Sequence, residues 1–226
     1  MRGLDRIPAS GGAIIAGNHP NVLDGILLQV VAPRPVRFLV AEELYFHRFL
    51  HWGFRAFGCV PVYRSKTHNG DALRSAVAAL DQGEVLGIFP EGTTRYRGTM
   101  PSIKRGVALL AMKTGCPVIP LAIHGSDAAF PEGARVPQPL PIRLEFAAPV
   151  AYARAAEPVI PEPEVMETME DIRRRILEAM EAGAPASAAA RGDGWLKEAQ
   201  VVLAALIIWP LAAFLTLTAN PRLDPA

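Results

Sequence analysis

Short apolar runs bounded by glycine and proline recur along the first two thirds of the chain and predict β-strands. Several contain almost no polar position, which is typical of strands buried on both faces of a parallel sheet. The six runs span residues 12–17, 36–41, 59–64, 85–90, 117–123 and 142–150. Because helical segments alternate with them, we predict an α/β fold, with a mostly parallel central sheet flanked by helices.

Two segments between these runs place apolar residues at helical spacing. Residues 70–83 do so and end at Gly83, a residue that commonly follows a helix. Residues 103–115 repeat the pattern, with Gly115 just before the next strand. The helices therefore fall where crossovers between parallel strands require them.

Beyond residue 156 the pattern changes. Proline-rich residues 157–165 predict a connector, and the residues after it carry an apolar stripe at helical spacing. We interpret the stripe as a packing face rather than a binding site; it consists of Val165, Met169, Ile172, Ile176 and Met180.

From Ala199 to Pro221 the chain carries no charged residue. About twenty apolar residues, rising about 1.5 Å each, span the hydrocarbon core of a bilayer, so we predict a C-terminal apolar helix in the membrane. A re-entrant or surface-lying anchor and a buried helix kinked at Pro210 are the alternatives. Basic residues precede the segment and favour a main domain on the cytoplasmic side.

These patterns divide the 226 residues into four regions. The length suits one sizeable domain with an appendage. We expect an α/β domain in residues 1–155, a connector with an amphipathic helix in 156–182, a flexible linker in 183–194 and a hydrophobic membrane segment in 195–226.

Composition narrows the range of functions. A formal net charge of +1 gives no electrostatic case for a nucleic-acid partner. Cys59 and Cys116 lie far apart beside strand-like runs, so we expect reduced thiols rather than a disulfide, and no metal site. The polar start of the chain has no apolar core of a signal peptide.

Polar residues with catalytic potential follow the first strand. His19 and Asp24 lie between an apolar strand and an apolar helix, where open α/β folds place their sites. A histidine can take the proton of a substrate hydroxyl, and a carboxylate can orient its imidazole and stabilise the charged form. We interpret them as a working pair; the alternative is a helix cap at Asn21 or Asp24 with an incidental histidine.

A second constellation, FPEGTTRYRG, occupies residues 89–98 after the strand predicted over 85–90. It is followed by further basic residues at Lys104 and Arg105, and it contains the cation Arg95. A surface ion pair between Glu91 and one of these cations is the alternative to a functional role. The candidate site residues here are a carboxylate, a flexible position and a hydroxyl, at Glu91, Gly92 and Thr93.

A third candidate is Arg64, at the end of the strand predicted over 59–64. A guanidinium in that position suits a phosphate group, because its planar fork donates two hydrogen bonds at once. The alternative is a solvated strand end, as most single arginines are.

In this order, the blocks resemble the glycerolipid acyltransferase family, typified by 1-acylglycerol-3-phosphate acyltransferase. The resemblance covers residues 3–150. The motifs are Asn-His-x4-Asp at residues 18–24, a block ending in arginine at 58–64, Phe-Pro-Glu-Gly-Thr at 89–93 and a proline-containing strand at 118–121, with a basic stretch at 103–106.

The resemblance implies an O-acyltransferase that moves a fatty acyl group from acyl-CoA or an acyl carrier protein to a glycerol-phosphate-type lipid acceptor. The typical acceptor is 1-acylglycerol 3-phosphate, which gives phosphatidic acid. It implies that His19 is the general base, that Asp24 orients it, and that no metal or cofactor is needed beyond the thioester co-substrate. The residues implied in substrate binding are Asn18, Arg64, Glu91, Gly92, Thr93, Arg95 and Lys104.

The chain departs from the common family pattern at Thr94, which displaces the following cation by one position, and at Asn21, where many members have serine. Glycerol 3-phosphate and other lysophospholipids are therefore alternative acceptors. Thioester hydrolysis is a rival reaction, although water needs no phosphate-binding arginines. An inactive, membrane-bound lipid-binding protein is the alternative from a different class.

Overall fold

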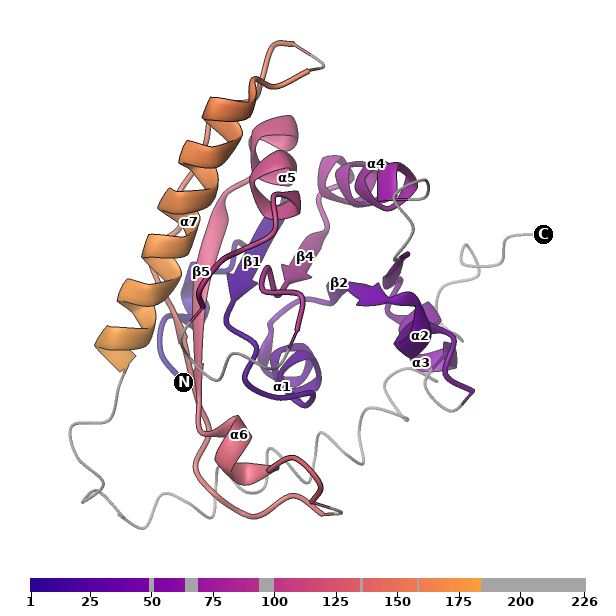
Figure 1. Ribbon diagram of the computed structural model, residues 1–226, viewed down its shortest axis with the longest axis vertical. Coiled ribbons are helices and arrows are strands. Elements are labelled where there is room, and N and C mark those ends of the chain that lie inside the picture. Colours follow the sequence, from indigo (N-terminus) through magenta and orange to yellow (C-terminus); the bar gives the residue numbers. More distant parts are fainter. Residues whose placement is uncertain (49–50, 64–68, 94–99, 135, 158, 184–226) are drawn as a thin grey trace.

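A computed structural model describes residues 1–48, 51–63, 69–93, 100–134, 136–157 and 159–183. A six-stranded sheet in the order β3-β2-β4-β1-β5-β6 forms its centre (Figure 1). All neighbouring strands pair in parallel except β5 and β6, which confirms the predicted fold class. The strands are β1 (Ala13–Gly17), β2 (Val36–Ala41), β3 (Val60–Val62), β4 (Val85–Ile88), β5 (Val118–His124) and β6 (Arg143–Phe146).

Each predicted strand corresponds to an observed one: β2 has the predicted bounds, β5 is shifted by one residue, and the other four are shorter than predicted. The largest difference is at residues 142–150, where the regular strand ends at Phe146 and runs antiparallel to β5. The connection between β5 and β6 is not a long crossover helix of the kind that joins parallel strands. The chain passes through the short α6 (Ser126–Ala129) and a loop instead. A short 3-10 helix, η1 (Leu4–Arg6), precedes β1.

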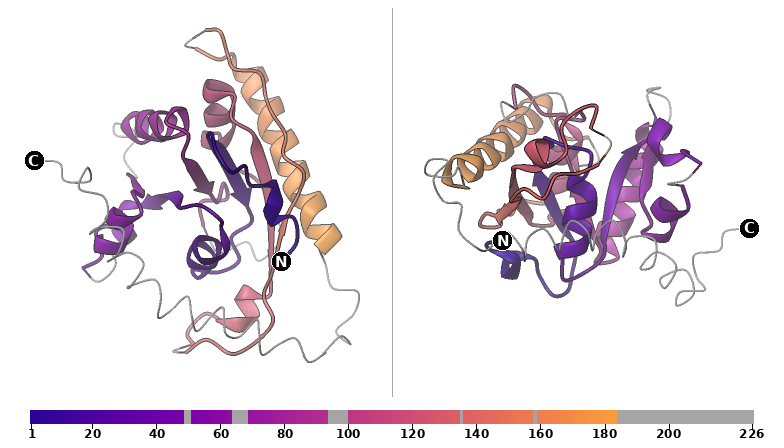
Figure 2. Two further views of the ribbon diagram at one scale, coloured as in Figure 1. Left: turned by 180° about the vertical axis from the view of Figure 1, so that it is seen from behind. Right: turned by 90° about the horizontal axis from the view of Figure 1, so that it is seen from below.

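Helices cover both faces of the sheet (Figures 1 and 2). Ile14 and Ile15 of β1 point to opposite faces, because successive side chains of a strand alternate. Ile14 packs in one cluster with α4 (Asn69–Asp81), α5 (Gly106–Thr114) and α7 (Glu162–Gly183). Ile15 packs in the other with residues of α1 (Asp24–Val31), α2 (Glu42–Tyr45) and α3 (His51–Ala56).

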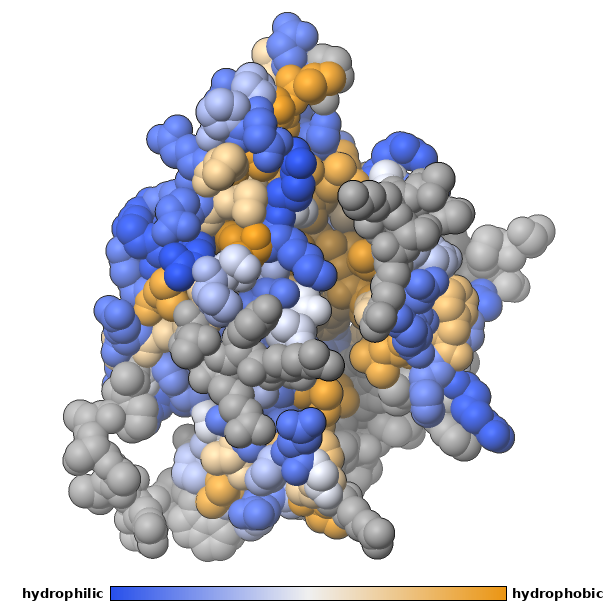
Figure 3. Space-filling model, viewed as in Figure 1, coloured by the Kyte–Doolittle hydropathy of each residue, from blue (hydrophilic) through white to orange (hydrophobic). Residues whose placement is uncertain are grey.

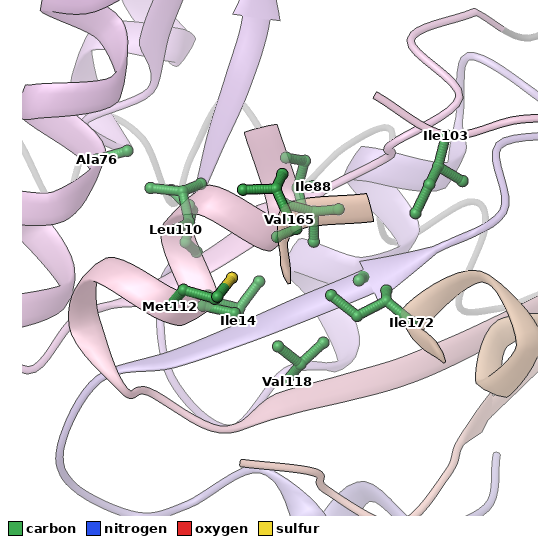
Figure 4. Close-up of a cluster of buried hydrophobic side chains, with 14 of the residues drawn as sticks. Ile14, Ala76, Ile88, Ile103, Leu110, Met112, Val118, Val165 and Ile172 are labelled. Carbon is green, nitrogen blue, oxygen red and sulfur yellow. The ribbon is translucent and has the colours of Figure 1, made fainter. Parts of the chain in front are cut away.

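The apolar stripe predicted for the last of these helices is confirmed as a packing face. Val165, Ile172 and Ile176 are fully buried, and Figure 4 shows the first two meeting side chains of α5 and the central strands. The outward face of α7 is largely hydrophilic (Figure 3). The helix therefore packs in the same core as the sheet, as its apolar stripe predicts.

Within the described part of the chain, no helix is both long and apolar enough to cross a bilayer. The membrane segment predicted over 195–226 lies outside the described residues, as does nearly all of the linker predicted before it. Cys59 and Cys116 are both free thiols, as predicted. Burial raises the pKa of the Cys59 thiol to about 11.

Candidate active site

The structure brings His19 and Asp24 together at the carboxyl end of β1, the strand between β4 and β5. Nδ1 of His19 lies 2.9 Å from Oδ2 of Asp24. The Asp24 side chain is completely buried, whereas one fifth of the His19 side chain is exposed. A buried carboxylate can hold the proton on Nδ1, which directs the lone pair of Nε2 outward as a base.

Asp24 also shapes the turn that carries the pair. Its Oδ2 accepts the backbone N–H of Asn21 at 2.7 Å, and α1 begins at Asp24 itself. The side chain of Asn21 accepts the N–H of Leu23 and donates to the carbonyl of Phe130 at 2.6 Å. One carboxylate thus bonds both the His19 ring and the backbone of the turn. The helix-capping alternative is wrong, because the residue before α1 is Leu23 and no side chain caps the helix. The functional interpretation of the pair stays a prediction.

The second constellation meets the first through Phe89 and Glu91, at the end of β4. The Phe89 ring stacks on the His19 ring, with centroids 4.1 Å apart and an angle of 11° between planes. Oε1 of Glu91 accepts the backbone N–H of His19 at 3.1 Å. One motif thus supports both the ring and the main chain of the other.

Glu91 is a buried carboxylate. Burial raises its pKa, with the nearby charge of Asp24 acting in the same direction; the hydrogen bond from His19 opposes both. Oε2 of Glu91 and Oδ1 of Asp24 are buried and have no hydrogen-bond partner among the described residues. Two carboxylates therefore lie close to His19, one at its ring and one at its backbone N–H.

Gly92 and Lys104 lie side by side at the edge of the site. Gly92 has a φ of +67°, which disfavours any residue with a Cβ, and an added Cβ would lie 2.3 Å from Nζ of Lys104. The backbone N–H of Lys104 donates to the carbonyl of Pro90 at 2.8 Å, which fixes the chain before α5. The exposed ammonium is therefore held beside the Glu91–Gly92 turn, and Thr93 follows it, half-buried.

Asn18 lies between β1 and the turn, and its side chain is directed into the sheet. It is 2 % exposed, and both atoms of its amide group are bonded to the backbone of Ile123 in β5. Arg64 and Arg95, the two arginines predicted to bind phosphate, lie outside the described residues. Their predicted roles therefore stay predictions.

Motif reading did not single out two contacts of the site: the ring of Phe89 and the side chain of Asn21. Phe89 begins the Phe-Pro-Glu-Gly-Thr block, directly after a buried strand, so its position at the strand end was the available signal. The bond from Asn21 to Phe130 joins segments 109 positions apart and has no local signal.

The comparisons with known proteins agree on one family. A family model described as Acyltransferase matches residues 1–124. The chloroplast 1-acyl-sn-glycerol-3-phosphate acyltransferase LPAT1 of Arabidopsis thaliana is 28% identical over 135 residues, which cover 59% of this chain and 38% of that protein. The 1-acyl-sn-glycerol-3-phosphate acyltransferase of Bacillus subtilis is 29% identical over 122 residues, which cover 54% of this chain and 60% of the relative.

A solved structure shares the fold as well. The crystal structure of the 1-acyl-sn-glycerophosphate acyltransferase PlsC from Thermotoga maritima aligns with a TM-score of 0.64 and 28% sequence identity, over 82% of this chain and 72% of that one. The match to the curated relatives is partial, with 38% of the first and 60% of the second covered. The family model nevertheless covers more than half of the 226 residues and includes the His19–Asp24 turn and the Glu91 turn, so the chain belongs to the glycerolipid acyltransferase family.

Proposed function

We propose that the protein transfers a fatty acyl group from a thioester, acyl-CoA or acyl carrier protein, to the free hydroxyl of 1-acylglycerol 3-phosphate, giving phosphatidic acid. The observation that carries the proposal is the pair at the end of β1. Nδ1 of His19 is bonded to a fully buried Asp24, and the imidazole is partly exposed. The relatives named above for this activity support the choice of acceptor.

In the proposed reaction, Nε2 of His19 removes the proton of the acceptor hydroxyl while that oxygen attacks the thioester carbonyl carbon. Asp24 stabilises the imidazolium that forms. The Glu91 side chain is bonded to the backbone N–H of the same histidine. Cleavage of the carbon–sulfur bond then releases the thiolate, which takes the proton back from the imidazolium. The products are an ester and a free thiol, and His19 returns to its neutral form.

We propose that Lys104 binds the phosphate of the acceptor. Its ammonium is exposed beside Gly92, on a segment that is bonded to the carbonyl of Pro90. A lysine acts on a phosphate as a point charge, and arginines add bidentate hydrogen bonds. Arg64 and Arg95 are the proposed sources of such bonds, and the Gly92–Thr93 backbone and hydroxyl complete the set.

The acceptor and the product are lipids, so we propose that the protein works at a membrane, with its α/β domain on the cytoplasmic side. The uncharged run from Ala199 to Pro221 supports the association. The flexible linker predicted over 183–194 would let the domain reach the bilayer surface.

The test is transfer of a labelled acyl group from acyl-CoA to 1-acylglycerol 3-phosphate in mixed micelles, with free CoA and lipid product measured together. Wild type is compared with His19→Ala and with His51→Ala. His51 is a matched control, because it also stacks on a phenylalanine ring, Phe46, and bonds through Nδ1, but to the carbonyl of Tyr45. We expect phosphatidic acid from wild type and His51→Ala, and a loss of at least about 10³-fold in His19→Ala.

Other results would change the assignment. Release of CoA without lipid product indicates hydrolysis. Lipid product formed only with glycerol 3-phosphate, or only with another lysophospholipid, identifies that molecule as the acceptor in place of 1-acylglycerol 3-phosphate. No turnover by wild type with any of these donors and acceptors contradicts the proposal and favours a lipid-binding protein.

A further inference from the structure

Asn18 does not have the environment of a substrate ligand. Its side chain is 2 % exposed, Nδ2 donates to the carbonyl of Ile123 at 2.9 Å, and Oδ1 accepts the N–H of Ile123 at 2.7 Å. Ile123 is itself 1 % exposed, so its two backbone groups depend on these bonds. Both hydrogen-bonding atoms of the Asn18 amide are therefore used inside the sheet.

The register of β1 and β5 explains why a side chain is needed there. Ile14 pairs with Val118 and Ala16 with Pro120, and the N–H of Ile14 donates to the carbonyl of Pro117. In a parallel ladder of this register, every second residue of β1 bonds to β5. Continued beyond Gly17, the ladder would join the carbonyl of residue 18 to the N–H of Ile123, and the N–H of residue 20 to the carbonyl of Ile123.

The second of these bonds is impossible with this sequence, because residue 20 is a proline and has no N–H. The Asn18 side chain makes both bonds to Ile123 instead: its oxygen takes the place of the backbone carbonyl of residue 18, and its NH2 takes the place of the N–H that Pro20 lacks. The sheet is thus completed by a side chain, and the main chain is free to leave the ladder at His19.

The main chain leaves the ladder in the direction of β4. The N–H of His19 donates to Glu91, which follows β4, at 3.1 Å. His19 is therefore fixed from both neighbouring strands, by Asn18 on the β5 side and by Glu91 on the β4 side. Because the backbone of His19 is held from both sides, its ring is placed against Asp24 and Phe89.

We propose that Asn18 is a positioning residue for His19, and that it acts through Ile123 rather than on the substrate. The proposal replaces the substrate-binding role expected from the motif, and its kinetic arm rests on the proposed acyl transfer. Asn18→Asp is the sharpest variant, because it keeps the size and the acceptor for the Ile123 N–H but places a carboxylate oxygen against the Ile123 carbonyl. Asn18→Ala removes both bonds.

Thr114→Val is the matched control. Thr114 is also buried, and it also makes two bonds to backbone: it donates to the carbonyl of Leu110 at 2.7 Å and accepts the N–H of Cys116 at 3.2 Å. It lies at the end of α5, just before β5 begins. This is the amino end of the strands, whereas His19 lies at their carboxyl end. A general loss of stability affects this variant in the same way, whereas a loss of position at His19 does not.

Two measurements on the full-length chain test the proposal. In steady-state acyl transfer, we expect kcat to fall about 10²-fold in both Asn18 variants, with KM for the acceptor changed less than about twofold, and no such fall in Thr114→Val. In the NMR spectrum of histidine-labelled protein, we expect the Nδ1–H signal of His19, assigned by its loss in His19→Ala, to shift or disappear in the Asn18 variants but not in the control.

Some outcomes overturn the proposal. A raised KM with an unchanged kcat makes Asn18 a substrate ligand. A His19 signal in Asn18→Asp identical to that of wild type shows that the ring does not depend on the amide. If wild type transfers no acyl group, the proposed function fails, and the ring signal alone still decides the role of Asn18.

Discussion

His19 is held at three points: by Asp24 at Nδ1, by Phe89 along one face of its ring and by Glu91 at its backbone N–H. A catalytic base held in this way loses little orientational freedom when the substrate binds, which lowers the entropic part of the barrier. At the scale of single residues, the carboxylates of the site therefore have separable roles, and their substitutions give different results.

We expect Asp24→Asn to lower kcat by about 10³–10⁴-fold, because an amide does not stabilise the imidazolium and permits the wrong tautomer of His19. The fold is retained, since the amide oxygen can still accept the N–H of Asn21. Steady-state kinetics beside a thermal melt check this result. A tenfold or smaller loss of kcat in a folded variant contradicts the role assigned to Asp24.

Glu91→Gln is expected to increase stability at neutral pH. Burial raises the pKa of Glu91, so its contribution to stability is complete below the ordinary pKa of a glutamate and is lost as pH rises through the folded-state value. At pH 7 the ionised group is destabilising, and glutamine removes the charge while keeping an acceptor for His19. We expect a melting temperature about 2 °C higher than wild type at pH 7.

The pH dependence is the control for this prediction. The difference in melting temperature between Glu91→Gln and wild type should shrink as the pH is lowered below the ordinary pKa of a glutamate, because Glu91 of wild type is then neutral in both the folded and the unfolded protein. A difference that grows towards acid contradicts the direction of the pKa shift.

At the scale of elements, turns at strand ends bring the site together, and one helix supports the sheet from behind. The Glu91–Gly92 turn is shaped by a left-handed glycine whose open face accommodates Lys104. α7 covers β5 and packs against α5, and its buried side chains belong to the same cluster as Ile14 of β1. Both elements therefore act on the position of the site without supplying the base.

We expect Gly92→Ala to raise KM for the phosphate acceptor more than it lowers kcat, because the new Cβ displaces the Lys104 ammonium. The left-handed φ adds a stability cost of about 1–2 kcal/mol. Gly11→Ala is the matched control: its φ is +81° and its added Cβ meets nothing within 4 Å. Equal kinetic effects in the two variants would contradict a role for Lys104 in binding phosphate.

Ile176→Ala in α7 is expected to lower the free energy of unfolding by about 2–5 kcal/mol in a single transition, since the side chain is fully buried. Met166→Ala on the same helix is the control and should change stability by less than about 0.5 kcal/mol, because Met166 is 61% exposed. Denaturant unfolding followed by circular dichroism measures both. A separate early transition in Ile176→Ala would show that α7 unfolds independently of the sheet and would contradict this expectation.

The order of the six strands and of the long helices along the chain could be predicted because it depends on local patterns, whereas the short α2, α3 and α6 were not predicted. The apolar runs, the alternating helices and the His19–Asp24 spacing lie within short stretches of sequence. The support of the site could not be predicted in this way. Asn18 bonds a residue 105 positions away and His19 bonds one 72 positions away, so both contacts depend on strand order and register. The packing of α7 on β5 also joins segments that are far apart in the sequence, so no local pattern predicts it.

At the scale of the whole molecule, the domain and the uncharged run from Ala199 to Pro221 suit a protein that meets its substrate in a bilayer. We expect deletion of residues 195–226 to move the protein from the membrane fraction to the supernatant and to leave kcat towards a micellar acceptor within about twofold. Fractionation and a micelle assay measure the two effects. A deletion variant still wholly in the membrane fraction contradicts the proposed anchor.

The position of β1 between β4 and β5 also has a consequence for how the protein is made. His19 leaves the ribosome before its partners, because Glu91 lies 72 positions later and Ile123, contacted through Asn18, lies 105 positions after Asn18. Until β4 has emerged, the apolar β1 has no neighbour in the sheet, and until β5 has emerged the His19–Asp24 turn lacks the contact made through Asn18. Chains of this topology fold slowly and expose such strands meanwhile. Activity should therefore be among the last properties to return during refolding, well after most of the helix content.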